Sequence, residues 1–324
     1  MPQTALERQI RSQPQELERL ATHPLGHEAV ERLAQCRRIW LVGTGTSLHA
    51  AELGAAMLYE AGRGAQAIPS MHFVNWAPPV DHRDGMVLIS HNAGQETAYA
   101  AAAYRQAKDA GLRVLPLTRQ GAGLPDALET VPKEASETYT VSYTAVLLLL
   151  ARLANALGAE SLSPDAIAKV PGAVADAIEN PGIDRIVAPR RLLVLFGEGP
   201  ASVTAREGAL KLREASRFPA EGYDVEYLLH GSAVPLGSDD HLVALSPPDT
   251  DGLVRAVANA AEREGIRVTT LAETADLPPL LAQIPLTVRL QMLALRFAEA
   301  RGQNPDRVIT GAWGDAGLWG IGSP

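Results

Sequence analysis

The chain has 324 residues, 46% of them hydrophobic, and a formal net charge of −8 at pH 7. This length and composition fit a globular protein with two domains of ordinary size. The acidic balance and the lack of any block of Lys and Arg argue against a nucleic-acid partner. The longest apolar run, Ala145 to Ala151, is far too short to cross a bilayer, so we expect no membrane association.

Cysteine usage and the first residues favour a cytoplasmic protein. The single cysteine, Cys36, cannot form an intrachain disulfide or a metal cluster, which fits a reducing compartment. Residues 1–8 lack the charged start and apolar stretch of a signal peptide. We therefore expect a cytoplasmic location.

Helical periodicity opens the chain over residues 3–36, where Leu6, Ile10, Leu17 and Leu20 fall broadly on one face. Short apolar runs then alternate with alanine-rich helical stretches, which is the pattern of βαβ units around a parallel sheet. The first half predicts strands at 38–43, 86–90 and 113–117 and helices at 47–62, 96–111 and 143–157.

This alternation breaks after Leu157, where a polar stretch and a helical stretch to about Ile178 precede Asn180-Pro181-Gly182. The second half predicts strands at 192–197, 241–246 and 266–271 and helices at 202–217, 251–264 and 286–300. We therefore place a helical lead-in at 1–36, a first α/β domain at 37–160, a helical linker at 161–186 and a second α/β domain at 187–324.

The two halves repeat each other. Residues 39–47 return as residues 193–201, both apolar runs ending in Gly-x-Gly, at an offset of 154. Val87–Ser90 and Arg113–Leu117 also recur, as Val243–Ser246 and Arg267–Leu271. Three segments in one order at nearly one offset indicate a duplicated unit. The predicted fold is therefore α/β, with two doubly wound, flavodoxin-like parallel-sheet units in tandem.

The first copy carries polar turns after two of its strands, Gly43–Ser47 and Ser90–Thr97. Ligands of parallel sheets bind at the carboxyl ends of the strands, where helix N-termini favour anions. An alternative is that each hydroxyl only caps the helix that follows it. A dinucleotide site is disfavoured because the third glycine of its motif is missing. The predicted phosphate ligands are Thr46, Ser47, Ser90, Asn92, Gln95 and Thr97.

The second copy carries the most specific motif, Glu207–Ser216, followed by His230-Gly231. These residues resemble the Glu-Gly-Ala-Leu-Lys-Leu-Lys-Glu helix and the His-Gly-Pro segment of the sugar isomerase (SIS) domain family. Within that family the chain resembles the tandem-SIS isomerase half of glucosamine-6-phosphate synthase. Gly45-Thr46-Ser47 and Ser90–Thr97 resemble the two phosphate loops of the family.

Aldose–ketose isomerisation needs a base that moves one proton through an enediol and a group that opens the sugar ring. Glu207 and Glu214 are seven residues apart, so they share a helix face about 10 Å long. The resemblance implies that Glu214 is the base and that His230, supplied by a neighbouring subunit, opens the ring. Glu207 is a further catalytic candidate. The resemblance also implies sugar-lining residues at Glu137, Thr140 and Ser142.

Two alternatives remain open for the second copy. The charged face of the Glu207 helix would be solvated if Glu207 and Lys211 formed an ordinary i,i+4 pair. His230 would be a packed core histidine if its neighbours Leu229 and Gly231 were buried.

Three departures from the family limit the prediction. Asn92-Ala93 lengthens the second phosphate loop and removes a hydroxyl, and Thr310 stands where the synthase has an imine-forming lysine. The third departure is that Met1-Pro2 begins a helical segment without a cysteine nucleophile. We therefore expect no glutaminase domain and no glutamine-dependent synthase activity.

These observations predict a phosphosugar isomerase or amino-sugar-phosphate deaminase that acts as a homodimer with a shared active site. Its expected ligand is a sugar phosphate or amino-sugar phosphate, with neither a metal nor a nucleotide as cofactor. The alternative is a non-catalytic regulatory protein that binds a sugar phosphate.

Overall fold

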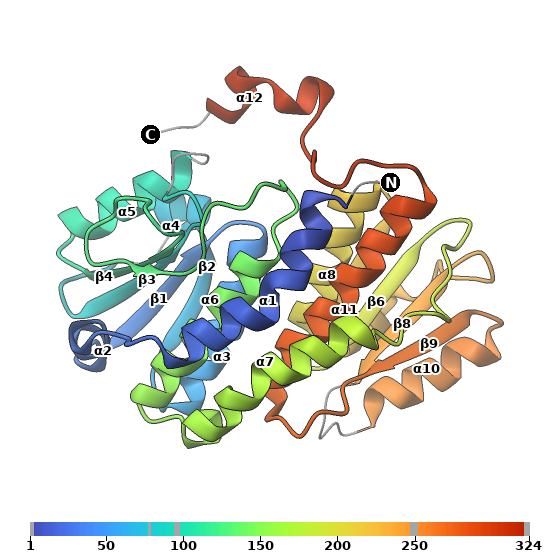
Figure 1. The fold of residues 1–324 in the computed structure, drawn as a ribbon, viewed down its shortest axis with the longest axis horizontal. Helices are drawn as coiled ribbons and strands as arrows, with labels where there is room; N and C mark the ends of the chain where they lie inside the picture. The colour runs from blue at the N-terminus through green and yellow to red at the C-terminus, as the bar shows by residue number, and fades with distance from the viewer. Residues whose placement is uncertain (1–2, 77–78, 94–97, 247–251, 321–324) are drawn as a thin grey trace. The chain divides into compact units, whose positions relative to one another are not determined.

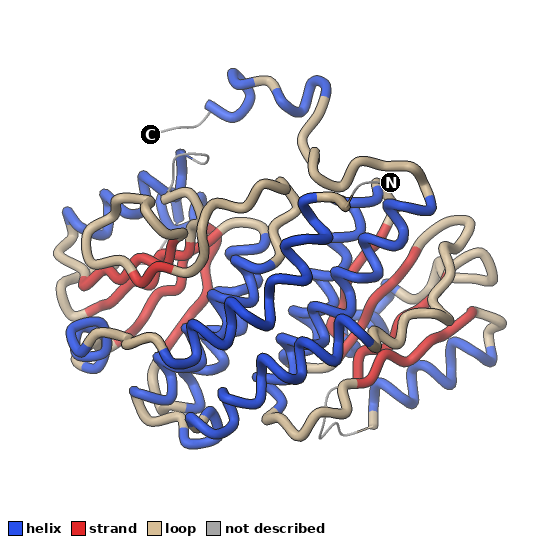
Figure 2. The backbone as a smooth tube through the Cα atoms, in the orientation of Figure 1, coloured by secondary structure: helices blue, strands red, loops and turns tan. Residues whose placement is uncertain are grey.

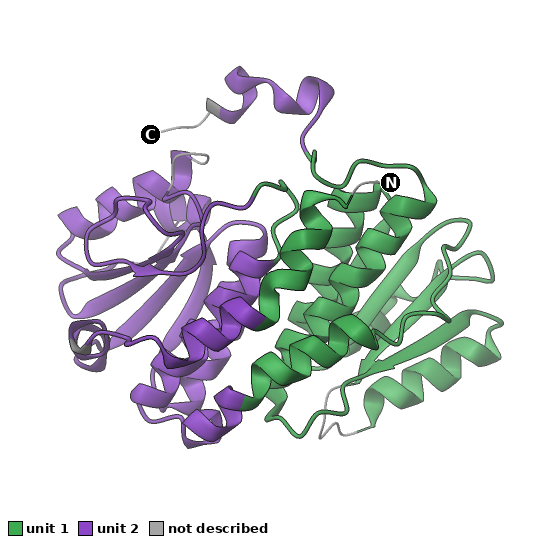
Figure 3. Cartoon of the chain, in the orientation of Figure 1, with its two compact units in different colours: residues 1–14, 135–140, 169–308 green, residues 15–134, 141–168, 309–324 purple. Residues whose placement is uncertain are grey.

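The computed structural model describes residues 3–76, 79–93, 98–246 and 252–320. They form two compact α/β units, each with one sheet flanked by helices (Figures 1 and 2). Unit 1 comprises residues 1–14, 135–140 and 169–308, and unit 2 comprises residues 15–134, 141–168 and 309–324 (Figure 3). The segment boundaries inferred from the sequence at residues 36, 160 and 186 stay a prediction.

The sheet of unit 2 is entirely parallel, with the strand order β2-β1-β3-β4-β5. Its strands are β1 (Arg38–Gly43), β2 (Ala65–Pro69), β3 (Asp84–Ile89), β4 (Arg113–Thr118) and β5 (Leu128–Glu129). The chain moves from β1 to one side and then returns to the other, so the order switches between β1 and β3. In doubly wound sheets this switch point is where ligands bind.

Helices cover both faces of this sheet. They are α2 (His27–Ala34), α3 (Thr46–Glu60), α4 (Ser70–Trp76), α5 (Ala98–Asp109) and α6 (Val141–Ala156). On one face Trp40 and Met86 pack with Phe73 of α4, and the Trp40 and Phe73 rings meet edge to face. On the other face Gly54 of α3 is so close to the sheet that an added Cβ would lie 2.8 Å from Leu41 and Leu150.

The sheet of unit 1 is also parallel and has the order β7-β6-β8-β9. Its strands are β6 (Leu193–Gly197), β7 (Ala220–Asp224), β8 (His241–Ser246) and β9 (Arg267–Ala272). Its helices include α8 (Pro200–Ser216), α9 (Val225–Tyr227), the π-turn η2 (Leu228–Ser232), α10 (Leu253–Arg263) and α11 (Pro279–Ala300). Gly208 of α8 repeats the role of Gly54, because an added Cβ would lie 2.4 Å from Leu290 and 3.0 Å from Leu195.

The first turn of each unit has the same backbone geometry. Gly45 has φ 56° and ψ −128°, and Gly199 has φ 52° and ψ −123°. Both glycines are the N-cap of the helix that follows, in a region of backbone space that L-residues rarely adopt. The shared turn, strand order and helix packing confirm the predicted fold of two tandem doubly wound units.

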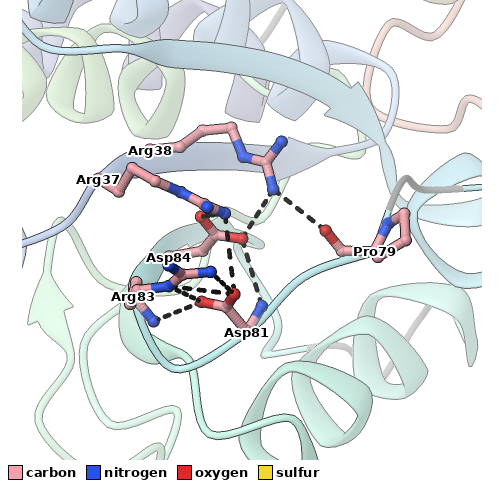
Figure 4. Close-up of polar contacts among 6 residues, drawn as sticks. All are labelled: Arg37, Arg38, Pro79, Asp81, Arg83 and Asp84. Atoms are coloured by element: carbon pink, nitrogen blue, oxygen red, sulfur yellow. Dashed lines mark hydrogen bonds and ion pairs between the residues drawn. The ribbon is translucent and has the colours of Figure 1, made fainter.

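A buried carboxylate lies at the amino end of the strands in the unit 2 sheet (Figure 4). The Asp84 side chain is fully buried and accepts hydrogen bonds from Arg38 Nη2 at 2.7 Å and Arg37 Nη2 at 3.1 Å. Asp84 also accepts from the main-chain N–H of Asp81 at 3.3 Å. Arg83 pairs with Asp81 beside it.

Unit 1 repeats this arrangement at the amino edge of its own sheet. The Asp240 side chain is fully buried, pairs with both Nε and Nη2 of Arg191, and accepts from the main-chain N–H of Gly237 at 2.8 Å. The Arg191 Nε contact measures 2.8 Å. The duplication therefore extends to a polar cluster that the sequence comparison did not include.

The tail and the start of the chain meet within unit 1. Both Asp306 carboxylate oxygens accept from the first turn of α1 (Ala5–Thr22), at 2.9 Å from Ala5 N and 2.8 Å from Leu6 N. Thr138 Oγ1 donates to Pro305 O at 2.8 Å. The remaining elements are η1 (Glu160–Leu162), α7 (Pro164–Glu179), η3 (Gly311–Gly314) and α12 (Ala316–Gly320).

Every strand predicted from the sequence is present within two residues at either end. The helical lead-in is two helices, because Pro24 and Gly26 interrupt it and Gly26 has φ 70°. The helix predicted from residue 286 begins at Pro279 and contains Pro285. The edge strands β2 and β7 lack an apolar run and were not predicted.

Candidate active site

The first polar turn lies at the carboxyl end of β1, at the β1/β3 switch point of unit 2. Because Gly45 is the N-cap of α3, neither Thr46 nor Ser47 occupies the capping position. This finding contradicts the alternative that both hydroxyls serve only as caps. Thr44 Oγ1 lies 3.1 Å from the hydroxyl of Ser70, which is buried.

The second polar turn follows β3 and lies at the same edge of the sheet. Ala93 N donates to Ser90 O at 3.2 Å, and Ala93 has φ 56°, a left-handed conformation that favours glycine. Asn92 is 5% exposed. Gln95 and Thr97, the other two predicted ligands in this turn, lie outside the described residues.

Arg119 is a residue of this turn region that the sequence analysis missed. It is the first residue after β4, and its Nε donates to Asn92 Oδ1 at 3.1 Å. Its main-chain N–H donates to His91 O at 3.1 Å. Its position directly after β4 could have indicated this role, because β4 pairs in parallel with β3 and the two strands end at the same side of the sheet.

The predicted sugar-lining residues lie in the segment before α6 and in the first turn of that helix. Glu137 Oε2 accepts from Val308 N at 2.7 Å, which ties the segment to the tail within unit 1. Thr140 and Ser142 are buried. Ser142 N, in the first turn of α6, donates to the buried carboxylate of Glu134 at 2.8 Å. A carboxylate at this position stabilises the helix N-terminus.

The charged face of α8 is buried. The side chains of Glu207 and Lys211 are fully buried, and that of Glu214 is 20% exposed. Lys211 Nζ lies 3.5 Å from Glu207 Oε1 and 2.5 Å from Glu214 Oε2, so one ammonium holds both carboxylates. The alternative of a solvated face is therefore wrong.

Burial raises the pKa of the Glu214 carboxyl above its ordinary value, although the Lys211 ammonium opposes the shift. The neighbouring Glu207 carboxylate adds to the rise. A carboxyl group whose pKa moves toward neutrality is suited to accept and return a proton.

His230 is exposed, so the alternative of a packed core histidine is wrong. It lies in the π-turn η2, where the next residue, Gly231, has φ 115°. Asp224, which caps α9 by accepting from Glu226 N at 2.9 Å, fixes the backbone before this turn.

No group of three or more His, Cys, Asp or Glu side chains within the described ranges is placed to hold a metal ion. None of the helices described is both long enough and apolar enough to span a bilayer.

Residues 32–156 match the family model of the SIS domain. These residues are thus identified as a SIS domain. It is 29% identical over 321 residues to glutamine–fructose-6-phosphate aminotransferase (isomerizing) of Chlorobaculum tepidum, covering 87% of this chain and 51% of that protein. The corresponding protein of Thermococcus kodakarensis is 27% identical, with 86% and 52% covered. The chain spans about half the length of these relatives.

Solved structures share the fold over nearly the whole chain. Glucosamine-6-phosphate deaminase of Thermotoga maritima has a TM-score of 0.79 at 20% identity, with 94% of this chain and 97% of that chain covered. Tagatose-6-phosphate ketose/aldose isomerase of Escherichia coli has a TM-score of 0.78 at 20% identity, with 96% and 97% covered. The chain resembles the isomerase half of the aminotransferases, as predicted from the sequence.

Proposed function

We propose that this chain binds a phosphorylated sugar or amino sugar and isomerises or deaminates it through an enediol. The observation that carries the proposal is the buried Glu207–Lys211–Glu214 cluster on α8. A helix rarely buries two charged side chains and most of a third without a role for them, because removing charges from water is costly. The names of the similar proteins include fructose 6-phosphate, glucosamine 6-phosphate and tagatose 6-phosphate, which supports this ligand class.

Glu214 is the proposed base. Burial raises its pKa, which makes the carboxylate a stronger base than an exposed glutamate. Lys211, held against both carboxylates, opposes that rise in the pKa of Glu214. Glu207 is fully buried, so we assign it to holding Lys211 in place rather than to proton transfer.

The polar turns of unit 2 are the proposed phosphate site. They lie at the switch point of a doubly wound sheet, and the positive end of the α3 dipole points toward a ligand there. Ser47, Thr46, Ser90 and Asn92 are the described ligand candidates.

His230 is the proposed ring-opening group, supplied to the partner subunit of a homodimer. Its exposed position next to exposed apolar side chains supports this assignment. Tyr227 is 65% exposed, Leu229 is 52% exposed and Val234 is 84% exposed. Exposed apolar side chains gathered in one short segment are typical of an interface with another protein molecule.

Deuterium exchange tests the proposed reaction. We expect the wild type to wash deuterium from the solvent into C1 or C2 of one of the three sugar phosphates named above. Glu214→Gln removes the base, so the exchange rate should fall by at least about a hundredfold. Mass spectrometry of the recovered sugar measures both rates.

Glu262→Gln is the matched control, because Glu262 is an exposed glutamate of α10 in the same unit. Its exchange rate should equal that of the wild type. Wild-type exchange that persists unchanged in Glu214→Gln would contradict the assignment of the base.

A second candidate is a regulatory protein that binds a sugar phosphate without turning it over. Thr310 in place of the family lysine and Asn92-Ala93 in the phosphate loop favour it. This candidate predicts that one of the three sugar phosphates raises the melting temperature of the protein, while none of them exchanges deuterium.

A further inference from the structure

Arg119 has no carboxylate partner among the residues that the structure describes. Its side chain is partly buried, and its hydrogen bonds go to Asn92 Oδ1 at 3.1 Å and Gln120 O at 2.9 Å. A guanidinium that is partly exposed and has no carboxylate partner is able to bind an anion from solvent. The protein as a whole carries a net charge of −8, so its surface does not supply general attraction for anions.

The position of Arg119 is fixed relative to the second polar turn by the sheet itself. β3 and β4 are paired up to Ile89 and Leu117, and Ser90 N donates to Leu117 O at 3.1 Å. The Arg119 main chain then bonds to His91 O, and its side chain bonds to Asn92. Two separate hydrogen bonds therefore attach this arginine to the turn.

The guanidinium edge that faces the turn is the one that binds oxyanions. Nη1 donates to Gln120 O, whereas Nε donates to the amide of Asn92. The hydrogens of Nε and Nη2 lie along one edge of the planar group, so Nη2 is directed to the same side as Asn92. Within the described ranges Nη2 makes no hydrogen bond or ion pair.

We propose that Arg119 binds the phosphate of the ligand through Nη2 while its Nε positions the Asn92 amide. This inference rests on the proposed function, since it assumes that the polar turns hold a phosphate. The family loop has a serine hydroxyl where this chain has Asn92-Ala93. In this proposal Arg119 makes the phosphate contact that such a hydroxyl would make. The ligand class that fits is a phosphate monoester, because a guanidinium favours the doubly charged oxyanion over a neutral sugar.

Binding measurements with Arg119 variants test the proposal. The probes are inorganic phosphate and fructose 6-phosphate, titrated calorimetrically into the full chain at low and high salt. Arg119→Gln should weaken the binding of both roughly ten- to a hundredfold and flatten its salt dependence, since one charge-assisted contact is lost. Arg119→Lys keeps the positive charge but lacks the planar group with two parallel N–H donors. It should therefore bind with the salt dependence of the wild type but with only part of its affinity.

Arg63→Gln is the matched control. Arg63 is also partly buried in unit 2 and donates to a main-chain carbonyl, that of Ala34, at 3.0 Å. It precedes β2 and therefore lies at the amino end of the strands, away from the polar turns at their carboxyl end. This variant removes the same charge and should bind both probes as the wild type does.

The outcomes separate the two proposals. If the wild type binds both probes and Arg119→Gln binds them equally well, Arg119 has no role in binding and the phosphate site survives without it. If Arg119→Gln and Arg63→Gln weaken binding equally, the effect is general electrostatics and the inference is also overturned. If the wild type binds neither probe, the proposed function fails and this inference fails with it. Should Arg119→Gln not fold, full wild-type affinity of Arg119→Lys would overturn the positioning of Asn92.

Discussion

Glu214, the proposed base, is also expected to make the stability of the protein depend on pH. Its folded pKa is raised by burial, so folding favours the protonated carboxyl over the carboxylate. The unfolded chain loses this proton at lower pH than the folded chain does. Between the two pKa values the folded state binds more protons, and stability therefore falls as the pH rises through that window.

This linkage predicts a pH-dependent stability difference for Glu214→Gln. The variant lacks the ionisation that opposes folding, so its free energy of unfolding relative to the wild type should increase as the pH rises above the ordinary carboxyl range. Below that range the two proteins should differ least. Chemical denaturation at several pH values measures the difference, and a constant offset across the series would contradict a raised pKa.

The sequence predicted the positions of the α8 carboxylates on their helix but not their surroundings. The spacing of Glu207 and Glu214 places them on one helix face, but the burial of that face depends on packing that no local pattern contains. Arg119 was missed because a single arginine after a strand is common. Only the pairing of β3 with β4 brings it to Asn92.

At the scale of elements, the buried carboxylates of Asp84 and Asp240, at the amino ends of the two sheets, should each stabilise their own unit to a similar extent. Burial alone would raise the pKa of Asp84, but hydrogen bonds from Arg38 and Arg37 lower it overall. The Arg191 hydrogen bond likewise lowers the pKa of Asp240. Each contribution is therefore present above the ordinary carboxyl pKa and is lost as the pH falls through the depressed folded value.

Asp84→Asn and Asp240→Asn should each reduce the free energy of unfolding by about 1–3 kcal/mol at neutral pH, because each loses charge-assisted hydrogen bonds to arginine. Denaturant titration of the two single variants measures this loss. Because the clusters lie in different units, the losses should add in the double variant. A loss in only one unit would show that the two clusters are not energetically equivalent.

Two strands whose bounds agree fully with the prediction have an unbroken apolar run. β1 and β8 have five buried residues each, and their bounds agree with the prediction. The edge strand β7, Ala220-Glu221-Gly222-Tyr223-Asp224, has one buried residue and no such run. Edge strands pair on one side only, so fewer of their positions need to be apolar, and the sequence signal weakens.

For the whole molecule, the contact between Asp306 and α1 joins residues that are 301 apart in the sequence. Asp306→Ala would leave the first N–H groups of α1 without their carboxylate partner, so the free energy of unfolding should fall by about 1–2 kcal/mol. Hydrogen exchange at the amides of Ala5 and Leu6 should accelerate. The control is Asp276→Ala, which removes an exposed pair with Lys169 and should leave both amides unchanged. Equal exchange in the two variants would contradict the capping role.

The same contact sets an order for folding during synthesis. The five described strands of unit 2 are all synthesised by residue 129 and its helix α6 by residue 156, whereas unit 1 combines residues 1–14 with residues up to 308. Helix α1 therefore lacks its capping residue, Asp306, until translation is almost complete. A nascent chain of this protein should acquire one protease-resistant half early and the other only when translation is almost complete.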